Sequence, residues 1–353
     1  MLFQRRFRPV IGLDITTSSI KLIELSKNGD SYRVESYAAE PSPPNAINEK
    51  AIVDAQAVGE AVRRAVKRAG ARARECAVAV SGDAAITKVI QMPRNLRENE
   101  LESQVEMQAD QYIPFPMEEV SYDFEVIGPS EKDPEMLDVL LVATRSENVE
   151  QRQAAVQAAG LTARIVDVEA FALENACRLL THQMPDGGME RNIAVIDFGA
   201  STTTFSVLRD LKVSYTRDFS FGGQQLTEEV MRTYGLSMEE AGRAKKEGGL
   251  PGNYETEVLG PFIDDMCQQV SRSLQFFLAS GAGREQPEQI LICGGCANIP
   301  GAAEMIQSRV GIDAQRGDPL GQMKVSQKAK AQSVKKDATA LLTACGLALR
   351  SFD

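Results

Sequence analysis

Val10-Ile-Gly-Leu-Asp-Ile-Thr-Thr-Ser-Ser-Ile-Lys-Leu-Ile-Glu-Leu25 is the stretch that decides the fold. Apolar residues up to Asp14 predict a strand, the small residues 16–19 predict a turn, and Lys21 lies at the start of a second strand. Backbone N–H groups in such a turn can reach a phosphate, Lys21 adds a positive charge, and Asp14 can hold a hydrated Mg²⁺. A polar turn between two apolar strands with no ligand would look the same, so this stretch alone leaves both interpretations open.

The same pattern returns at Ile193-Ala-Val-Ile-Asp-Phe-Gly-Ala-Ser-Thr-Thr-Thr-Phe-Ser-Val-Leu208. A repeated hairpin indicates two related domains. If both turns meet at one cleft, the phosphates and metal of a nucleotide would lie between two carboxylates and two hydroxyl-rich turns. The corresponding positions are Asp197 with Asp14, Gly199 with Thr16, and Ser201-Thr202 with Ser18-Ser19.

A third motif is Gln289-Ile-Leu-Ile-Cys-Gly-Gly-Cys-Ala-Asn-Ile-Pro-Gly301. Its apolar strand runs into two glycines, which let a flat ring approach the backbone without a Cβ in the way. The three motifs, in this order, resemble those of the superfamily of actin, sugar kinases and heat-shock chaperones. The resemblance implies an α/β fold of the actin-like ATPase type, with two related domains around a nucleotide cleft.

Composition limits the alternatives. The chain of 353 residues has room for two domains, and its 43% hydrophobic content allows substantial cores. A net charge of -10 argues against nucleic-acid binding, which depends on clustered lysine and arginine. We find no apolar run near the roughly 20 residues of a membrane span and no signal peptide, so we expect a cytoplasmic protein. Cys293-Gly-Gly-Cys296 has metal-site spacing, but with a single histidine in the chain a four-ligand zinc site is disfavoured.

The order of predicted elements suggests how the chain is divided. An amphipathic helix is expected from about Glu49 to Gly70, and a strand-helix-strand-strand block followed by a helix from Glu147 to Ala159 interrupts the first domain. The predicted ranges are 1–84 and 165–190 for the first actin-like domain, 85–164 for the inserted subdomain, 191–337 for the second actin-like domain with 217–287 as its smaller nucleotide-capping part, and 338–353 for a connecting helix that returns toward the first domain.

The position of this insert and the phrase Gln111-Tyr-Ile-Pro-Phe-Pro116 resemble the PilM family, the cytoplasmic actin-like components of type IV pilus assembly, which are related to the cell-division protein FtsA. FtsA normally ends in an amphipathic membrane-targeting helix, whereas this sequence stops at Arg350-Ser-Phe-Asp353, which favours PilM. The resemblance implies an ATP-binding scaffold at the cytoplasmic face of the inner membrane, with a role in pilus biogenesis and twitching motility. An FtsA-like cell-division homologue and a small-molecule kinase of the same superfamily are the alternatives.

The resemblance also implies roles for individual residues. Mg²⁺ would be held through water by Asp14 and Asp197. Thr16 is a departure, because many relatives have glycine there, and Gly242 is another, because FtsA-like helices often place a glutamate there. The implied ATP contacts are Thr16, Thr17, Ser18, Ser19 and Lys21 for the β-phosphate region, Gly199, Ala200, Ser201 and Thr202 for the terminal phosphates, and Gly294, Gly295 and Asn298 for the adenosine, with Gly222, Gly223 and Lys245 on its other side.

Hydrolysis and partner binding rest on fewer residues. Asp167 and Glu169, near the start of the first connecting helix, are candidate bases for hydrolysis, but either carboxylate would equally cap the helix, and we expect slow or absent turnover.

The resemblance also implies a partner that tethers the protein to the inner membrane. That partner is the amino-terminal cytoplasmic segment of PilN, held between the first domain and the insert, with other inner-membrane pilus proteins as further partners. The expected docking residues are Tyr112, Ile113, Pro114 and Phe115; alternatively, Ile113 and Phe115 pack the insert onto the domain core.

Overall fold

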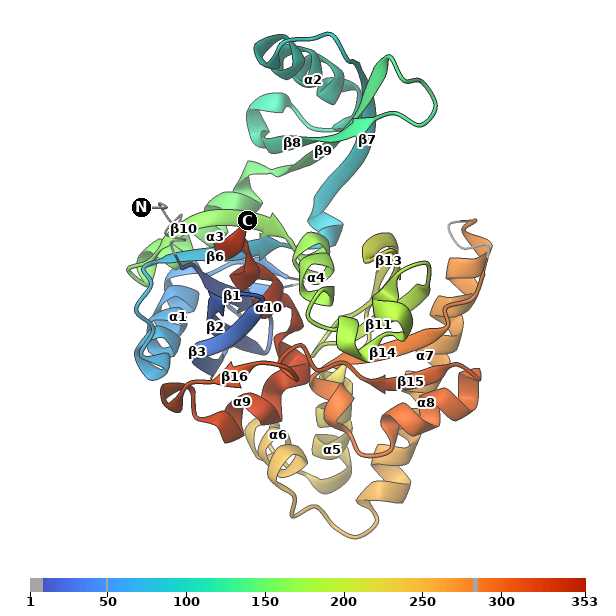
Figure 1. The fold of residues 1–353 in the computed structure, drawn as a ribbon. Coiled ribbons are helices and arrows are strands. Elements are labelled where there is room, and N and C mark those ends of the chain that lie inside the picture. The colour runs from blue at the N-terminus through green and yellow to red at the C-terminus, as the bar shows by residue number, and fades with distance from the viewer. Residues whose placement is uncertain (1–8, 49, 282–284) are drawn as a thin grey trace.

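The computed structural model describes residues 9–48, 50–281 and 285–353 (Figure 1). The first α/β domain is built on a sheet with the strand order β10-β6-β1-β2-β3-β16. Helices α1 (Ala55–Ala69) and α3 (Ser146–Ala158) cover one face of this sheet, while α4 (Glu169–Cys177), α9 (Ala331–Asp337) and α10 (Leu342–Leu349) lie on the other side. The strands are β1 (Ile11–Ile15), β2 (Ser19–Asn28), β3 (Ser31–Pro41), β6 (Glu75–Val80), β10 (Thr162–Val168) and β16 (Lys324–Val325).

The second domain contains a sheet with the order β13-β12-β11-β14-β15. Its core joins this sheet to α5 (Gly223–Tyr234), α6 (Met238–Glu247), α7 (Gly260–Ala279) and α8 (Ala302–Val310), and Phe198 and Phe205 are fully buried in it. The strands are β11 (Asn192–Phe198), β12 (Thr203–Arg209), β13 (Lys212–Phe219), β14 (Gln289–Gly294) and β15 (Asp313–Arg316).

The two sheets repeat one topology. In the first domain β1, β2 and β3 form an antiparallel meander, and β6 and β10 continue the sheet in parallel beyond β1. In the second domain β11, β12 and β13 form the same meander, and β14 and β15 continue in parallel beyond β11. Each predicted hairpin therefore occupies the same place in its own sheet.

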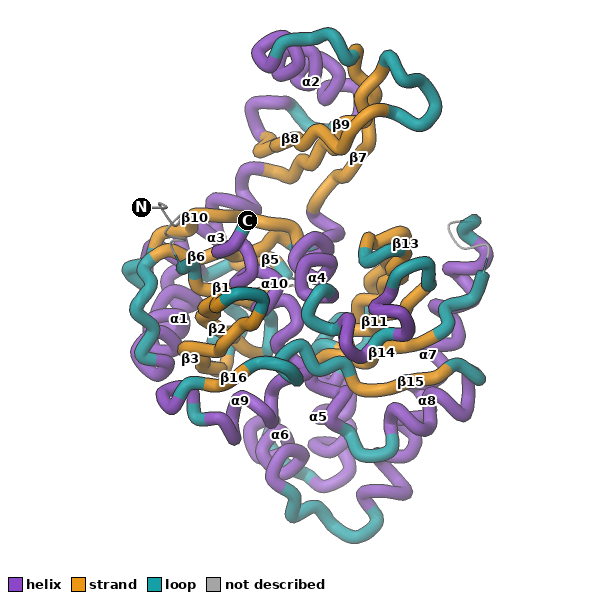
Figure 2. The backbone as a smooth tube through the Cα atoms, viewed as in Figure 1, coloured by secondary structure: helices purple, strands orange, loops and turns teal. Residues whose placement is uncertain are grey.

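The insert stands apart from both domains (Figure 2). It contains β7 (Ala85–Pro93), α2 (Glu98–Tyr112), β8 (Val120–Pro129) and β9 (Met136–Arg145), with the strand order β7-β9-β8. The apolar side of α2, including Leu101, Val105 and Ala109, packs on one face of this sheet. The expected order of strand, helix, strand and strand is therefore present.

The carboxyl boundary of the insert differs from the expected one. The sequence assigned residues up to 164 to the insert, but α3 packs against α1 in the core of the first domain, where Ala155 and Val156 are buried. A Cβ on Gly59 of α1 would lie 2.5 Å from Cβ of Ala158, so the two helices are in close contact. The insert therefore ends at residue 145.

The start of α1 also differs from the expected one. Residues expected to begin a helix near 49 instead form a short hairpin of β4 (Ile47–Asn48) and β5 (Ala51–Ile52). The helix begins after Asp54, whose carboxylate accepts a hydrogen bond from the N–H of Ala57 at 2.9 Å, as an N-cap does. Its predicted end is confirmed, because Gly70 adopts a left-handed conformation with φ of 62°. In the described ranges, no helix has the length and apolar character needed to cross a membrane.

Candidate functional site

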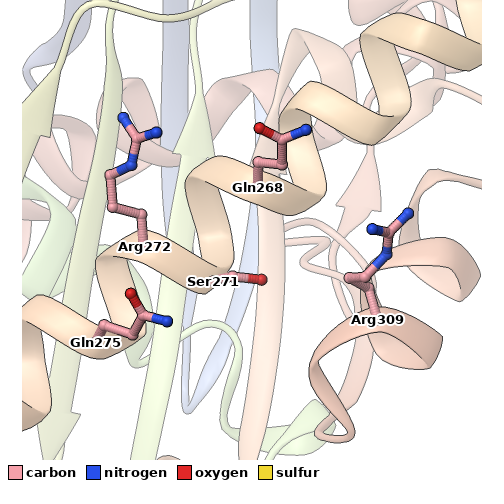
Figure 3. A pocket seen from close by; sticks show the side chains of 5 residues that line it. All are labelled: Gln268, Ser271, Arg272, Gln275 and Arg309. Atoms are coloured by element: carbon pink, nitrogen blue, oxygen red, sulfur yellow. The ribbon is translucent and has the colours of Figure 1, made fainter.

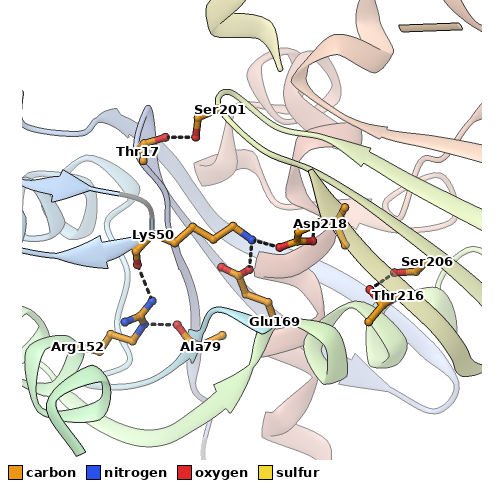
Figure 4. A network of polar contacts seen from close by, with 10 residues as sticks. Thr17, Lys50, Ala79, Arg152, Glu169, Ser201, Ser206, Thr216 and Asp218 are labelled. Atoms are coloured by element: carbon orange, nitrogen blue, oxygen red, sulfur yellow. Dashed lines mark hydrogen bonds and ion pairs between the residues drawn. The ribbon is translucent and has the colours of Figure 1, made fainter. Parts of the chain in front are cut away.

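The two hairpin turns meet between the domains. In the first turn the N–H of Thr16 donates to the carbonyl of Ser19 at 3.0 Å, and in the second the N–H of Gly199 donates to the carbonyl of Thr202 at 3.1 Å. The hydroxyl oxygens of Thr17 and Ser201, at the tips of the two turns, are 3.1 Å apart (Figure 4). Two segments separated by 184 positions in the sequence are thus brought into direct contact across the domain boundary.

Thr16 stabilises the first turn from within. Its hydroxyl donates to the carbonyl of Ser19 at 2.8 Å, and its carbonyl accepts a hydrogen bond from the hydroxyl of Ser42 at 2.6 Å. Gly199, the corresponding residue of the second turn, has no room for a side chain, since a Cβ there would lie 2.6 Å from the carbonyl oxygen of Thr202. The departure at Thr16 therefore has a local function, because its hydroxyl bonds the turn together.

Charged groups lie beneath the turns. Nζ of Lys21 is 2.8 Å from Oδ2 of Asp14, directly across the β1–β2 register. Burial lowers the pKa of Lys21, but the charges of Asp14 and Asp197 outweigh it and raise that pKa above its ordinary value. Burial raises the pKa of Asp197 to about 6; Lys21 opposes this rise and Asp14 adds to it. The two aspartates from the two domains are therefore within electrostatic reach of each other.

The amino end of α5 lies against the second turn. The N–H groups of Gly223 and Gln224 donate to the carbonyls of Gly199 and Ala200 at 3.0 and 2.8 Å. A Cβ on Gly222 would lie 2.4 Å from the carbonyl oxygen of Ala200, so only glycine permits this approach. The positive end of the helix dipole consequently lies next to a turn predicted to bind phosphate.

Lys245 reaches the start of the same helix from α6. Its Nζ donates to the carbonyl of Gly223 and to the hydroxyl of Thr227, both at 2.7 Å. Burial lowers the pKa of Lys245. The predicted group of Gly222, Gly223 and Lys245 is therefore assembled, with the lysine holding α6 to α5.

The glycine pair after β14 lies beside Asp197. Gly294 has φ of +85°, and a Cβ there would lie 2.5 Å from Oδ1 of Asp197, whereas a Cβ on Gly295 would project into open space. The backbone at Gly295 is therefore open to approach, as the predicted contact with a flat ring would require. Asn298 has a structural contact, because its amide donates to the hydroxyl of Thr339 at 3.0 Å and so ties the segment to the start of the returning chain.

These groups fit a magnesium nucleotide. Among the described residues, no three His, Cys, Asp or Glu side chains converge as a direct metal site. Mg²⁺ commonly keeps several waters and is held by one or two carboxylates together with substrate phosphates. Asp14 and Asp197 are a pair of that kind, and the turns and Lys21 would face the phosphates.

The two candidate bases have different environments. Asp167 is buried and both of its carboxylate oxygens are engaged: Oδ2 accepts a hydrogen bond from Nε of Arg350 at 2.7 Å and Oδ1 accepts from the N–H of Val168. It therefore anchors the chain's last turn. Glu169 lies at the start of α4 within electrostatic reach of Asp14, and burial raises the pKa of its carboxyl group while Lys50 opposes that rise. Of the two candidates, Glu169 is the one that lies within electrostatic reach of Asp14.

Sequence reasoning missed Lys50, its partner Asp218 and the pairing of Lys50 with Glu169. Lys50 lies in the turn between β4 and β5, and its Nζ contacts Glu169 at 2.8 Å and Asp218 at 2.7 Å (Figure 4). These partners are 119 and 168 positions away, and the stretch around Lys50 was expected to be helical. The strands on either side of Lys50, β4 and β5, have only two residues each, which is too few to give a recognisable strand pattern.

The expected docking segment follows α2. Ile113, which the sequence offered as an anchor for a partner, is only 5% exposed and is a core residue of the insert. Phe115 is partly buried against the same core, with the guanidinium of Arg145 4.2 Å from its ring centroid. Tyr112 is 41% exposed and Pro114 is exposed, so only these two of the four present a free surface.

A separate shallow pocket of about 240 Å³ lies on α7 and α8 (Figure 3). Its walls are polar, and none of the predicted site residues lines it. Arg309 on its rim is paired with Asp264 at 2.7 Å. The lining residues are Gln268, Ser271, Arg272, Gln275 and Arg309.

Comparisons with known proteins agree with this geometry. A solved PilM-PilN type IV pilus biogenesis complex contains a chain that is 27% identical, covering 98% of this chain and 99% of that one, with a TM-score of 0.79. The ethanolamine utilization protein EutJ from Carboxydothermus hydrogenoformans shares the fold at 17% identity and a TM-score of 0.56, covering 96% of this chain and 89% of that one. The fold is therefore that of the actin-like ATPases.

Curated relatives include the cell division protein FtsA. The chain is 25% identical over 340 residues to FtsA of Bacillus subtilis (strain 168), covering 84% of this chain and 76% of that protein. It is 23% identical over 358 residues to FtsA of Enterococcus hirae, covering 86% and 77%. The family model described as type IV pilus assembly protein PilM matches residues 12–352. With nearly its whole length matched, the chain belongs to the PilM family of type IV pilus assembly proteins.

Proposed function

We propose that this protein is an ATP-binding scaffold of the type IV pilus assembly complex at the cytoplasmic face of the inner membrane, where it supports pilus biogenesis and twitching motility. The observation that carries the nucleotide part is the contact of the two hydroxyl-rich turns above Asp14 and Asp197. ATP with Mg²⁺ would lie between these turns and bind both domains at once.

ATP in this proposal is a structural or switching ligand with slow or absent turnover. Asp167 is bonded to Arg350, and the Glu169 carboxylate is paired with Lys50. A base that orients water toward a terminal phosphate needs a free, correctly placed acceptor. The pairing of both carboxylates supports a binding role over rapid catalysis.

Thermal unfolding tests nucleotide binding. A ligand that binds only the folded protein adds RT ln(1 + [L]/Kd) to its stability, which is about 2.7 kcal/mol at a hundredfold excess over Kd. We expect Mg-ATP to raise the melting temperature of the wild-type protein, and AMP, which lacks the phosphates that the two turns would hold, to raise it less. Equal melting temperatures with and without Mg-ATP would contradict a nucleotide cleft.

The partner proposed for the scaffold is the amino-terminal cytoplasmic segment of PilN. Its support is the 27% identity to a chain of a PilM-PilN complex over almost the full length of both chains. Phe115 lies near the point where the insert joins the first domain, since Arg145, the residue before α3, lies over its ring at 4.2 Å and the hydroxyl oxygens of Ser121 and Ser146 are 3.1 Å apart. An exposed Tyr112 beside that junction would act as an aromatic anchor.

A peptide titration tests this docking site. Tyr112→Ala is expected to weaken binding of a peptide with the partner's first residues at least tenfold, while Mg-ATP still binds. Met107→Ala is the matched control, because Met107 is 66% exposed on the same helix and is not part of the proposed site. Phe115→Ala provides a second variant at the junction. Unchanged peptide affinity in both folded variants would place the tether elsewhere.

A further inference from the structure

Lys50 crosses from the first domain to the second. It sits at the tip of the β4–β5 hairpin, and its ammonium group is bonded both to Glu169 at 2.8 Å and to Asp218 at 2.7 Å. Glu169 begins the connecting helix α4, and Asp218 lies near the end of β13 in the second domain. One side chain therefore joins the hairpin, the connecting helix and the second domain (Figure 4).

The second-domain end of this bridge is fixed in place. Oδ1 of Asp218 accepts a hydrogen bond from the hydroxyl of Thr204 at 2.6 Å, while Oδ2 faces Lys50. Thr204 lies directly across the β11–β12 register from Asp197. The bridge is thus one strand away from the carboxylate proposed to hold Mg²⁺.

The first-domain end is held by Arg152 of α3. Its guanidinium donates to the carbonyl of Lys50 at 3.0 Å, to that of Asn148 at 3.2 Å, and to that of Ala79 at the end of β6. Arg152 is 4% exposed, and Lys50 has a left-handed backbone with φ of 67°. A lysine in this conformation needs its surroundings to hold it there, and the Arg152 bond to its carbonyl does so.

Electrostatics make Lys50 the centre of the bridge. Burial lowers the pKa of Lys50, but Glu169 and Asp218 outweigh it and raise that pKa above its ordinary value, so the side chain stays cationic. Without this cation, two carboxylates from opposite sides of the cleft would repel each other in a partly buried space, and Asp14 adds to that repulsion at Glu169. Removing this positive charge would therefore free Asp218 of the second domain from the hairpin and leave it facing Glu169 without a cation between them.

We propose that Lys50 is a latch that holds the two domains together across the floor of the cleft, and that Arg152 is the residue that positions it. α3, which carries Arg152, begins directly after β9 of the insert ends at Arg145. A shift of the insert would reach the latch through this helix. The effect on nucleotide release rests on the proposed function, whereas the latch itself does not.

The test measures the distance between the domains without nucleotide. Each of the six native cysteines is buried and so is shielded from the labelling reagent. Spin labels are attached at two exposed positions, Glu60→Cys in α1 and Met238→Cys in α6, and pulsed electron paramagnetic resonance measures the distance between them. Lys50→Met keeps the aliphatic stem and is expected to shift the distance distribution to longer values. Arg152→Met is also expected to shift the distance distribution to longer values, although it leaves Lys50, Glu169 and Asp218 unchanged.

Lys212→Met is the matched control. Lys212 of β13 also pairs with a glutamate of α4, Glu174, at 2.9 Å, but its side chain is 72% exposed. An exposed pair contributes little, so this variant should keep the wild-type distribution. If Lys50→Met does not fold, Asp218→Asn removes the second-domain charge while keeping the shape of the side chain.

The second measurement is release of a fluorescent ATP analogue. Lys50→Met is expected to release it at least fivefold faster than the wild type and Lys212→Met at the wild-type rate. If Lys50→Met, or Asp218→Asn used in its place, gives the wild-type distance distribution, the latch is refuted. If Arg152→Met gives the wild-type distribution, the positioning role of Arg152 is refuted. Absence of analogue binding to the wild-type protein would refute the proposed nucleotide function instead, since the distances are measured without ligand.

Discussion

The two connecting helices, α4 and α10, touch at Gly346, so we expect one added methyl group there to destabilise the folded protein strongly. α10 crosses α4 at Gly346, where a Cβ would lie 1.7 Å from the carbonyl oxygen of Ala172 and 2.6 Å from its carbonyl carbon. Real Cβ contacts stay beyond about 3.0 Å, so Gly346→Ala forces these helices apart by roughly 1 Å. The amide of Asn175 also donates to the carbonyl of Gly346 at 3.1 Å, and that bond would stretch.

The magnitude follows from two opposing terms. Overpacking a well-packed core costs about 1–3 kcal/mol, and a crossing with no space to relax lies at the upper end of that range. Replacing glycine by alanine within a helix returns at most about 1 kcal/mol. We therefore expect Gly346→Ala to lower the free energy of unfolding by ~2 kcal/mol.

Gly242 provides the control. It lies inside α6, where a Cβ would meet no atom within 4 Å, so Gly242→Ala should raise the free energy of unfolding by about 0.5–1 kcal/mol. Urea denaturation followed by circular dichroism measures both variants. The reasoning is refuted if Gly346→Ala proves as stable as Gly242→Ala, because the helices would then not be in contact as described.

Two further predictions concern charged groups. Asp197 has a folded-state pKa of about 6 against its ordinary 3.8, so the wild-type protein is most stable below about pH 4 and loses stability as the pH rises through 6 and this carboxyl group ionises. Asp197→Asn cannot ionise there, so in urea denaturation its free energy of unfolding should rise relative to that of the wild type by up to ~3 kcal/mol between pH 4 and pH 7. A difference that does not change with pH would contradict the burial of this charge. Arg350→Met removes the ion-pair partner of the buried Asp167 and should lower the free energy of unfolding by about 3 kcal/mol without changing the affinity for Mg-ATP. Weaker Mg-ATP binding by the folded variant would instead indicate that Asp167 takes part in nucleotide binding.

The sequence predicted the repeated core well, because both hairpins carry the pattern in consecutive residues. Alternation of apolar side chains, the turn residues and the aspartate all lie within about sixteen positions, and the order of strand, helix, strand and strand in the insert was predicted from similar local patterns. The assignment of α3 to the insert was wrong because periodicity identifies a helix without identifying the body it packs on. Gly59 and Ala158, whose small size allows the contact with α1, are far apart in the chain.

Side-chain partners were the least predictable feature. The sequence did not show that Ile113, expected as a docking anchor, lies in the core of the insert, since an apolar residue before a Pro-Phe-Pro turn has the same pattern whether it is buried or exposed. Asp167 and Glu169 are two positions apart, yet one is bonded to Arg350 and the other to Lys50, since the strand ends between them and the helix starts. Such contacts depend on tertiary structure, which no local pattern in the sequence records.

Calorimetric titration of Mg-ATP tests the central claim, that the two turns and the two aspartates form one nucleotide site. The wild-type protein should bind with a stoichiometry near one, and Asp197→Ala should bind at least tenfold more weakly because the metal's water shell loses one of its two carboxylates. Asp186→Ala, which removes an exposed aspartate paired with Arg191, should bind as the wild type does. Equal affinity of Asp197→Ala and the wild type would contradict the site.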